Sequence, residues 1–534
     1  MKILQSCLSF LLICECLFWG SPAAAGESVR FRPEASFALS RLWQQCGNAL
    51  ALSDGGEAVL YVPFRRSGSP ALYDEGSVRK FALSDSSQGR LIWQSSVPTV
   101  RRILIPPFEG GAPQSGPCRE ISSDDAASSF ASLDAEQWRA LCGLLKKAPL
   151  RAPWPASFVE AEGMLYTVTD DGLVCALDAE TGREAWAFLP PQVLSSGRIK
   201  AYMEATSHGA VPFLTSGGLT AEKVSSGRQN RLFLWGTLGK GARGLFCLDV
   251  TDSDKPLFMW SREERQDETI LYGARDDQRS ELGFCSAAPL AVPLGGVFSL
   301  LLPNGEGSPG GLSVFHALTG EAIASETSLE QKSLCLTPSA LKDGSGGLSR
   351  VLCCDDEGGI QIFLRKGRFP KAEERVDLAR VSGAEKVRCV FSPIACPLYG
   401  EDLFAFVAEC RQGTVVAAAP AECSDLQWAP PPRRGKREAW AQILEGFRSP
   451  FAALCLDGFL YLLGWEEQSK TLKILDLRRG TLSASESADK DAAGLVALKG
   501  RAVVVKDGGS ASIALAEASS GSLPASVKGY TLFR

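Results

Sequence analysis

A short unit of strands and turns recurs along this chain and constrains the fold more than any other feature. Residues 170–191 read DDGLVCALDAETGREAWAFLPP. The residues just before them, MLYTVT at 164–169, alternate with the two-residue period of a strand. Asp-Gly and Thr-Gly mark tight turns, because glycine adopts positive φ without steric cost. The unit therefore predicts a three-stranded antiparallel meander with Trp186 near its end.

Similar units occur on both sides of this meander, which is too small to bury both of its own faces. They lie at 58–93, 231–260, 297–325 and 350–369, with weaker copies further along the chain. Strand-and-turn repeats of about 40–70 residues predict a β-propeller, whose sheets pack face to face around an axis. We predict an all-β, quinoprotein-like propeller of about seven blades with loop insertions. Trp93, Trp186 and Trp260 are expected to fill the gaps between blades. An irregular pair of β-sandwiches is the alternative fold.

The flanking segments complete the predicted domain organisation. Residues 1–25 combine Lys2, an apolar core and a small-residue ending, which predicts a secretory signal peptide. Residues 26–150 are assigned to a first blade-like segment plus a helical insertion, 151–485 to the propeller blades, and 486–534 to C-terminal strands and a tail. Within the insertion, Asp134 is the expected N-cap of a helix, with a glutamine three residues later.

Charge and hydropathy exclude several classes of protein. The net charge is −5, and no basic face of the kind that binds nucleic acid is apparent. After residue 25, no stretch reaches the roughly 18 uncharged apolar residues that a membrane-spanning helix needs. We therefore expect an exported chain with no transmembrane segment after signal cleavage.

The chain holds 17 cysteines, three of them in the predicted signal. Some of the others could pair in an oxidising compartment, but one sequence does not give their connectivity. Cys353 and Cys354 are adjacent in an expected strand. Neighbouring strand residues point to opposite faces, so these two are expected to stay unlinked.

Longer motifs resemble one family, the PilC/PilY proteins of type IV pilus assembly and of the pilus tip. LYTVTDDGLVCALDAETGREAWAFLPPQVL resembles the blade motif of that family, and GTLGKGARGLFCLDVTD resembles its glycine-rich strand motif. LGFCSAAPL and VFSPIACPLYG keep the family's order. The resemblance runs from about residue 55 to about residue 485.

This resemblance implies an exported, non-enzymatic protein that supports pilus assembly, opposes pilus retraction and acts in adhesion. The implied partners are minor pilins and the type IV pilus machinery, with a host or abiotic surface as a further target. The implied location is the periplasm, the outer-membrane surface or the pilus tip. The von Willebrand A-like region found at the N-terminus of long family members is expected to be absent.

The family also commonly carries a calcium loop rich in aspartate. Aligning on RVLCCDDEGG places LKDGSGGLS at that loop, so the ligand positions become Leu341, Asp343, Ser345 and Ser349. Calcium takes about six to eight oxygen ligands, usually with several carboxylates. One carboxylate and two hydroxyls make a poor set, so we expect no metal and no other cofactor here.

Two alternative functions share parts of the same pattern. Pyrroloquinoline quinone-dependent dehydrogenases have the same Leu-Asp, Thr-Gly and Trp signature in their blades, and a periplasmic scaffold for outer-membrane protein assembly is the second alternative. Neither His208 nor His316 accompanies a G-x-S-x-G nucleophile motif, and no carboxylate pair stands out. No catalytic residue is therefore assigned, and binding of other proteins is the predicted function.

Overall fold

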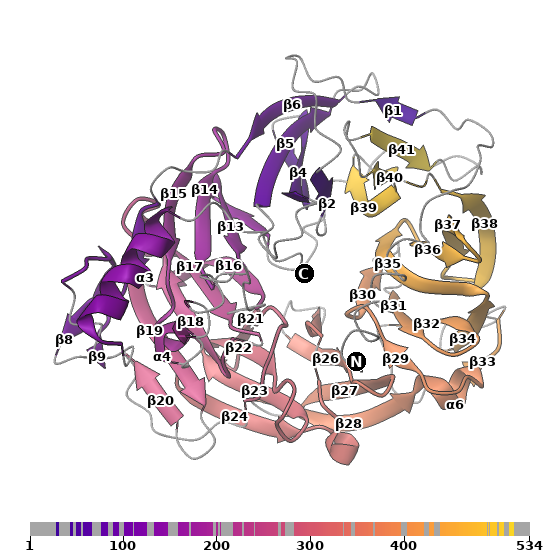
Figure 1. Cartoon of the computed structure of the whole chain (residues 1–534). Coiled ribbons are helices and arrows are strands. Elements are labelled where there is room, and N and C mark those ends of the chain that lie inside the picture. The colour runs from indigo at the N-terminus through magenta and orange to yellow at the C-terminus, as the bar shows by residue number, and fades with distance from the viewer. Residues whose placement is uncertain are drawn as a thin grey trace, which may run out of the picture.

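The structure of this chain is a computed structural model in which strands dominate. It describes residues 28–30, 43–45, 50–54, 57–66, 76–83, 89–95, 101–109, 112–124, 133–147, 158–169, 172–195, 199–200, 203, 217–226, 229–239, 241–264, 269–272, 282–334, 336–342, 348–366, 369–396, 403–420, 427–431, 438–488, 490, 492–498, 501–506 and 512–516. The predicted signal at 1–25 lies outside these residues. The described strands form eight sheets of four or more strands, placed in chain order around a common centre (Figure 1). An all-β propeller is confirmed.

The first four sheets are numbered here as blades 1 to 4. Blade 1 holds β2 (Trp43–Gln45), β3 (Leu50–Asp54), β4 (Glu57–Arg66), β5 (Gly76–Leu83) and β6 (Gly89–Gln94). Blade 2 holds β7 (Ile103–Ile105), β11 (Arg119–Glu120), β12 (Val159–Ala161), β13 (Met164–Val168), β14 (Val174–Asp178) and β15 (Glu184–Phe188). Blade 3 holds β10 (Gly116–Pro117), β16 (Leu219–Ser226), β17 (Gln229–Thr237), β18 (Gly244–Asp249), β19 (Leu257–Glu264) and β20 (Thr269–Tyr272). Blade 4 holds β21 (Leu290–Leu294), β22 (Val297–Pro303), β23 (Gly311–His316) and β24 (Ala322–Thr327).

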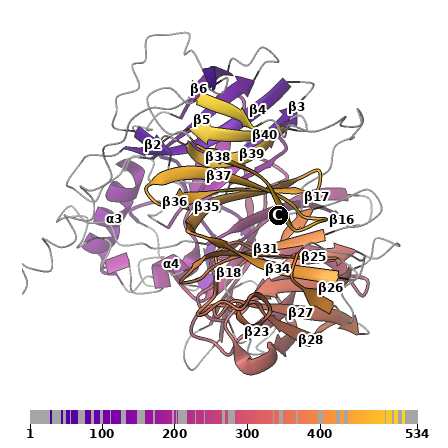
Figure 2. The same ribbon diagram turned by 90° about the vertical axis from the view of Figure 1, so that its right-hand side faces the viewer.

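Blades 5 to 8 follow in the same manner. Blade 5 holds β25 (Ser339–Lys342), β26 (Leu348–Cys354), β27 (Gly359–Lys366) and β28 (Phe369–Asp377). Blade 6 holds β29 (Arg388–Cys389), β30 (Ile394–Cys396), β31 (Leu403–Glu409), β32 (Gly413–Pro420), β33 (Gln427–Ala429) and β34 (Glu438–Glu445). Blade 7 holds β35 (Phe447–Leu456), β36 (Phe459–Glu466), β37 (Ser469–Asp476) and β38 (Thr481–Ser487), which lie in the side facing the viewer in Figure 2. Blade 8 holds β39 (Ala492–Leu498), β40 (Arg501–Lys506), β41 (Ser512–Ala516) and β1 (Ser28–Arg30).

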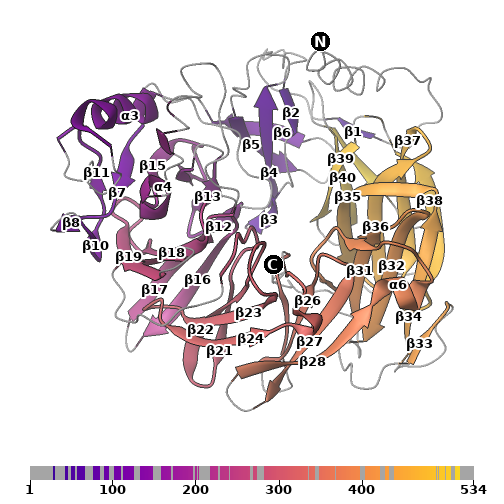
Figure 3. The same ribbon diagram turned by 60° about the horizontal axis from the view of Figure 1, so that its bottom comes forward.

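Blade 8 is closed by a strand from the other end of the chain. Strand β1 pairs with β41 in antiparallel fashion, with Val29 opposite Ile513. Figure 3 shows β1 beside β39 and β40 of the same sheet. The described residues thus make one sheet more than the seven blades expected from sequence. The difference arises because blade 8 is complete only with β1, and pairing between opposite ends of a chain leaves no local pattern.

The remaining elements lie outside the eight sheets. They are the small sheet of β8 (Phe108–Glu109) and β9 (Ala112–Pro113), helices α3 (Ala135–Lys147), α4 (Pro191–Ser195) and α6 (Leu378–Ser382), and the 3-10 turn η1 (Leu329–Gln331). None of the helices in the described part of the chain is both long enough and apolar enough to cross a membrane.

Helix α3 begins as the sequence predicted. The Asp134 carboxylate accepts the backbone N–H groups of Glu136 and Gln137, at 2.9 and 2.8 Å. The Gln137 side chain accepts the N–H of Asp134 in return, at 3.2 Å. These reciprocal bonds form a capping box, which satisfies donors that the first helical turn leaves without partners. The predicted N-cap is confirmed.

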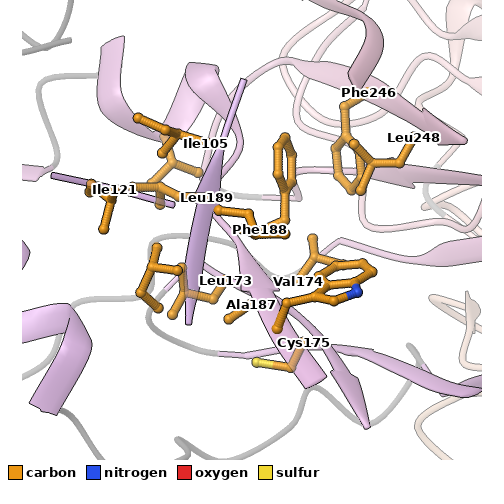
Figure 4. Close-up of a cluster of buried hydrophobic side chains, with 14 of the residues drawn as sticks. Ile105, Ile121, Leu173, Val174, Cys175, Ala187, Phe188, Leu189, Phe246 and Leu248 are labelled. Atoms are coloured by element: carbon orange, nitrogen blue, oxygen red, sulfur yellow. The ribbon is translucent and has the colours of Figure 1, made fainter. Parts of the chain in front are cut away.

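The insertion that carries α3 packs against blade 2 at the outer edge of the ring (Figure 1). Trp138 and Leu141 of α3 are fully buried in one apolar cluster with residues of β13, β14 and β15. Figure 4 shows Phe188 of β15 between Ile105 of β7 and Phe246 of blade 3. The rings of Phe188 and Phe246 lie 6.0 Å apart. The insertion and the neighbouring blade therefore share one core.

Tryptophans link consecutive blades through hydrogen bonds to main-chain carbonyls. The indole N–H of Trp186 in blade 2 donates to Ser253 O of blade 3, at 2.6 Å. Trp260 in blade 3 donates to Ala317 O of blade 4, at 3.1 Å. Trp440 repeats this from blade 6 to Leu477 O of blade 7, at 2.9 Å. The predicted position of Trp186 and Trp260 between blades is confirmed, whereas the Trp93 side chain lies outside the described residues.

In blades 4 and 7, a glycine in the turn before the last strand makes room for the tryptophan of the preceding blade. Gly320, in the turn between β23 and β24, has φ +72, and a Cβ atom there would meet the Trp260 ring at 2.6 Å. Gly480 of blade 7 has φ +71 and would meet the Trp440 ring at 2.9 Å. Backbone geometry and inter-blade packing thus both require glycine at this position. This contact explains why both turns carry a glycine.

In blades 2 and 7, an aspartate at the start of the corresponding turn caps the turn itself. One carboxylate oxygen of Asp178 accepts the N–H of Glu180 and the N–H and hydroxyl of Thr181. Asp476 accepts the N–H groups of Arg478 and Arg479 in the corresponding turn of blade 7. The bond from the Thr181 N–H is the main cause that lowers the pKa of Asp178. The charged aspartate is therefore the form that stabilises the turn.

Replacing Gly320 by alanine should destabilise the ring more than a matched replacement elsewhere. Gly163 has φ +75, and a Cβ atom added there would have no other atom within 4 Å, so Gly163→Ala measures the cost of positive φ alone. That cost is about 1 kcal/mol. Gly320→Ala adds overlap with the Trp260 ring, which costs about 2 kcal/mol more. Urea denaturation of both variants measures the difference, and equal midpoints would contradict the packing argument.

The contribution of Asp178 to stability should depend on pH. Because its pKa is lowered on folding, the stabilisation is complete above the unfolded pKa and is lost as the pH falls through the folded pKa. Asp178→Asn removes this titration. Wild type should therefore exceed the variant in unfolding free energy at about pH 6, and the gap should shrink at about pH 3. A gap of equal size at both pH values in urea titrations would show that ionisation of Asp178 has no such effect.

Candidate functional site

The calcium-like loop identified in the sequence joins β25 to β26 in blade 5. Asp343 and Ser345 lie outside the described residues. The Ser349 hydroxyl donates a hydrogen bond to Leu341 O at 3.2 Å. The pairing of the two strands shifts register here, since Leu341 lies opposite Arg350 and Lys342 opposite Leu348. Of the four aligned ligand positions, the structure brings Leu341 and Ser349 together at a β-bulge at the base of the hairpin.

The side chains at this base are used in packing and in the hairpin. Leu341 is 8% exposed and lies in the apolar core between blades 5 and 6. Among the described residues, no three His, Cys, Asp or Glu side chains gather in a group that could hold a metal ion. The residues described at this base thus offer one hydroxyl and no carboxylate, which is a poor match to calcium chemistry. The absence of tight calcium binding stays a prediction.

The neighbouring hairpin between β26 and β27 is organised by Asp355. Its carboxylate accepts the N–H groups of Glu357, at 3.1 Å, and Gly359, at 2.6 Å. Asp355 is 2% exposed, so these bonds are made away from water. A Cβ atom on Gly359 would lie 2.2 Å from the Asp355 carboxylate, which explains the glycine at this point. The turn predicted at these residues is observed.

The same carboxylate also accepts hydrogen bonds from two side chains of the following strands. Gln361 in β27 donates from Nε2 at 3.1 Å. Arg375 in β28 donates from Nε at 2.8 Å and forms an ion pair with Asp355. We call Asp355, Gln361 and Arg375 the Asp355 hub. Because a buried carboxylate is stable only when paired and hydrogen-bonded, each member of the hub supports the others.

The Asp355 hub holds the segment that connects blade 4 to blade 5. The Gln361 amide accepts the N–H of Leu329 and donates to its carbonyl, both at 3.1 Å. Arg375 also pairs with Glu330, with Nη1 to Oε2 at 3.2 Å. Glu330 and Gln331 have positive φ values of 61° and 54°. Two such residues in succession are strained, so the bonds from the hub fix a conformation that the segment would not favour alone.

Charged side chains around the hub reach the surface. Glu330 and Glu357 are 60% and 59% exposed at their side chains, and Lys332 pairs with Glu357 at 2.7 Å. Burial is the main cause that raises the pKa of Asp356, followed by repulsion from Asp355 and Glu357. The arrangement presents a fixed, charged loop at one end of blade 5. Its carboxylates are engaged by main-chain donors and cations, which suits a rigid contact surface better than proton transfer.

Of the two histidines, His316 lies in the described part of the chain and within a turn of blade 4. His316 takes the turn position that Asp178 and Asp476 hold in other blades, and its Nδ1 accepts the N–H of Leu318 at 3.2 Å. His208 lies outside the described residues. Sequence reasoning identified the Asp355 turn but missed Gln361 and Arg375. Gln361 and Arg375 act through contacts with neighbouring strands, and no local sequence motif predicts those contacts.

Calcium titration tests the assignment of this loop. We expect no calorimetric heat of binding at micromolar calcium for the wild-type chain, because the aligned positions hold only one carboxylate, Asp343. Asp343→Ala should give the same flat titration. Micromolar binding by the wild-type chain that disappears in Asp343→Ala would show that the loop is a calcium site.

Comparison with known proteins gives matches over parts of the chain. The family model described as outer membrane protein assembly factor BamB matches residues 74–232. A type IV pilus biogenesis factor PilY1 homolog of Xylella fastidiosa is 32% identical over 164 residues, which is 30% of this chain and 12% of that protein. The type IV pilus biogenesis factor PilY1 of Pseudomonas aeruginosa is 26% identical over 145 residues, 27% of this chain and 11% of that protein.

One solved structure belongs to the same group of proteins. The crystal structure of the Pseudomonas aeruginosa PilY1 C-terminal domain aligns with a TM-score of 0.48 at 15% identity, over 66% of this chain and 92% of that chain. The matched regions span about a tenth of the length of the two curated relatives. Within those regions, the resemblance to the PilC/PilY family is confirmed, and this part of the chain is related to the PilY1 biogenesis factors of type IV pili.

Proposed function

We propose that this protein acts in type IV pilus biogenesis by binding other proteins. The observation that carries the proposal is the relationship, at 32% identity over 164 residues, to a protein named as a pilus biogenesis factor. The name of that relative and the name of the matching family model describe assembly and not a reaction. We therefore infer a non-enzymatic role without a catalytic residue or cofactor.

The tightly connected blades support a role in binding other proteins. Consecutive blades share buried cores and are linked by Trp186, Trp260 and Trp440. A scaffold of this kind holds its surface loops in fixed positions, and such loops commonly carry recognition. The loop held by the Asp355 hub is one example. Minor pilins and the pilus machinery are the proposed partners, and a host or abiotic surface is a further proposed target.

We also propose where the protein acts and at which stage of pilus formation. We place the protein outside the cytoplasm, at the periplasm, the outer-membrane surface or the pilus tip, with residues 1–25 as a cleaved signal peptide. There it would help pilus assembly begin and oppose retraction. Adhesion is the third proposed role.

A second candidate function is support of outer-membrane protein assembly. The match of residues 74–232 to the BamB family model favours it. The two candidates differ in which cellular structure suffers when the protein is lost: surface pili in the first case, and the protein content of the outer membrane in the second.

Deleting the gene from the organism that carries it should remove surface pili and twitching motility. Wild type and Gly163→Ala should restore both, whereas Gly320→Ala should restore them less well because its ring is less stable. Electron microscopy of pili and twitching-zone diameters measure the result. Normal piliation in the deletion strain contradicts the pilus role. Depleted outer-membrane proteins with normal pili would favour the second candidate instead.

A further inference from the structure

Buried cysteines occur in facing pairs where blades 5, 6 and 7 meet. Cys354 ends β26 of blade 5, and Cys389 ends β29 of blade 6. Both are buried in the apolar cluster between these two blades, at 1% and 7% exposure. Cys389 is the first cause that raises the pKa of the Cys354 thiol, an influence that acts only between nearby groups. The two cysteines thus lie close together in one cluster, although they belong to different sheets.

A second pair spans the next interface. Cys396 ends β30 of blade 6, and Cys455 lies in β35 of blade 7, against which β30 packs. Both are buried in the cluster shared by these blades, at 0% and 7% exposure. Cys455 is the first cause that lowers the pKa of Cys396, and the main-chain N–H of Gly458 in blade 7 lowers it further. The same arrangement thus occurs at two successive interfaces.

The adjacent Cys353 does not take part in the pair formed by Cys354. Cys353 lies in a different cluster, with residues of blades 4 and 5, while Cys354 faces blade 6. Neighbouring residues of a strand point to opposite faces, as the sequence predicted for these two cysteines. Cys354 thus faces Cys389 across the interface, and a bridge to Cys353 would need a distorted strand.

We propose that Cys354–Cys389 and Cys396–Cys455 close as disulfides that join blades 5, 6 and 7 in the oxidised protein. All four are thiols in the present structure. Two thiols buried in one interface cluster can be joined once they approach to the S–S distance of about 2.05 Å. The bonds would close loops of about 35 and about 60 residues and so restrict the unfolded chain.

The chemistry requires a disulfide-bearing oxidant, such as glutathione disulfide or a thiol–disulfide oxidoreductase. A protein thiolate attacks one sulfur of the oxidant and displaces a thiolate, which leaves a mixed disulfide. The second protein thiol loses its proton and attacks the first protein sulfur, displacing the other half of the oxidant. Two protein thiols are oxidised, one oxidant disulfide is reduced to two thiols, and the two protons pass to those products.

Both cysteines of the second pair are buried in the closed interface, where an oxidant cannot reach them. Oxidation therefore belongs to the folding stage, before the interface between blades 6 and 7 closes.

Peptide mapping tests the proposal on the full chain. The protein is produced in an oxidising compartment, quenched in acid, alkylated and digested. Trypsin leaves Cys389 and Cys396 in one peptide, since the next basic residue is Arg411, so chymotrypsin is added to cut after Phe391. We expect Cys396 linked to Cys455 and Cys354 linked to Cys389, with fragment ions separating Cys353 from Cys354. The oxidised chain should also melt several degrees above the reduced chain.

Single variants provide the controls. Cys455→Ala should free Cys396 for alkylation and leave the other link intact, and Cys354→Ala should do the reverse. Cys247→Ala removes a buried thiol of blade 3 and should change neither link. The proposal is overturned if the four thiols of folded wild-type protein are found alkylated. It is also overturned if they are linked to other cysteines. This map is read on purified protein, so its outcome is independent of the pilus role.

Discussion

The ring depends on one repeated contact, in which an indole N–H of one blade donates to a main-chain carbonyl in a turn of the next. Trp260 and Trp440 make it above a glycine, Gly320 or Gly480, that has no side chain to obstruct the ring. A buried carbonyl in a turn has no strand partner, so the indole satisfies it while the aromatic surface fills the gap. Each such contact ties the packing of one sheet to the backbone of its neighbour.

Local features of the fold could be predicted from the sequence, because the residues involved are close together in it. The capping box at Asp134, the turn at Asp355 and the opposite facing of Cys353 and Cys354 all follow from spacings of one to four residues. In these three cases the physical cause lies within a single turn or strand. The position of Trp186 between blades followed instead from the repeat.

Other features depend on residues that meet only in the folded ring. Pairing of β1 with β41 joins opposite ends of the chain, and it changed the expected number of blades. Arg375 reaches Asp355 across two strands, and Cys396 and Cys455 come together at the interface of blades 6 and 7. The residues of the candidate site that make it rigid were missed for this reason. Periodicity predicts that strands exist but does not show which side chains will share an interface.

The pairing of β1 with β41 also imposes an order on folding. Residues 28–30 are made long before their partners at 512–514. Contacts so distant in sequence form slowly, because a very long loop has to close first. Blades 1 to 7 can assemble without residues 512–516, whereas β1 can pair only after β41 has been made. Joining of the ring is thus the final step of assembly, and until then the edges of β1 and β41 stay open to mispairing with other chains.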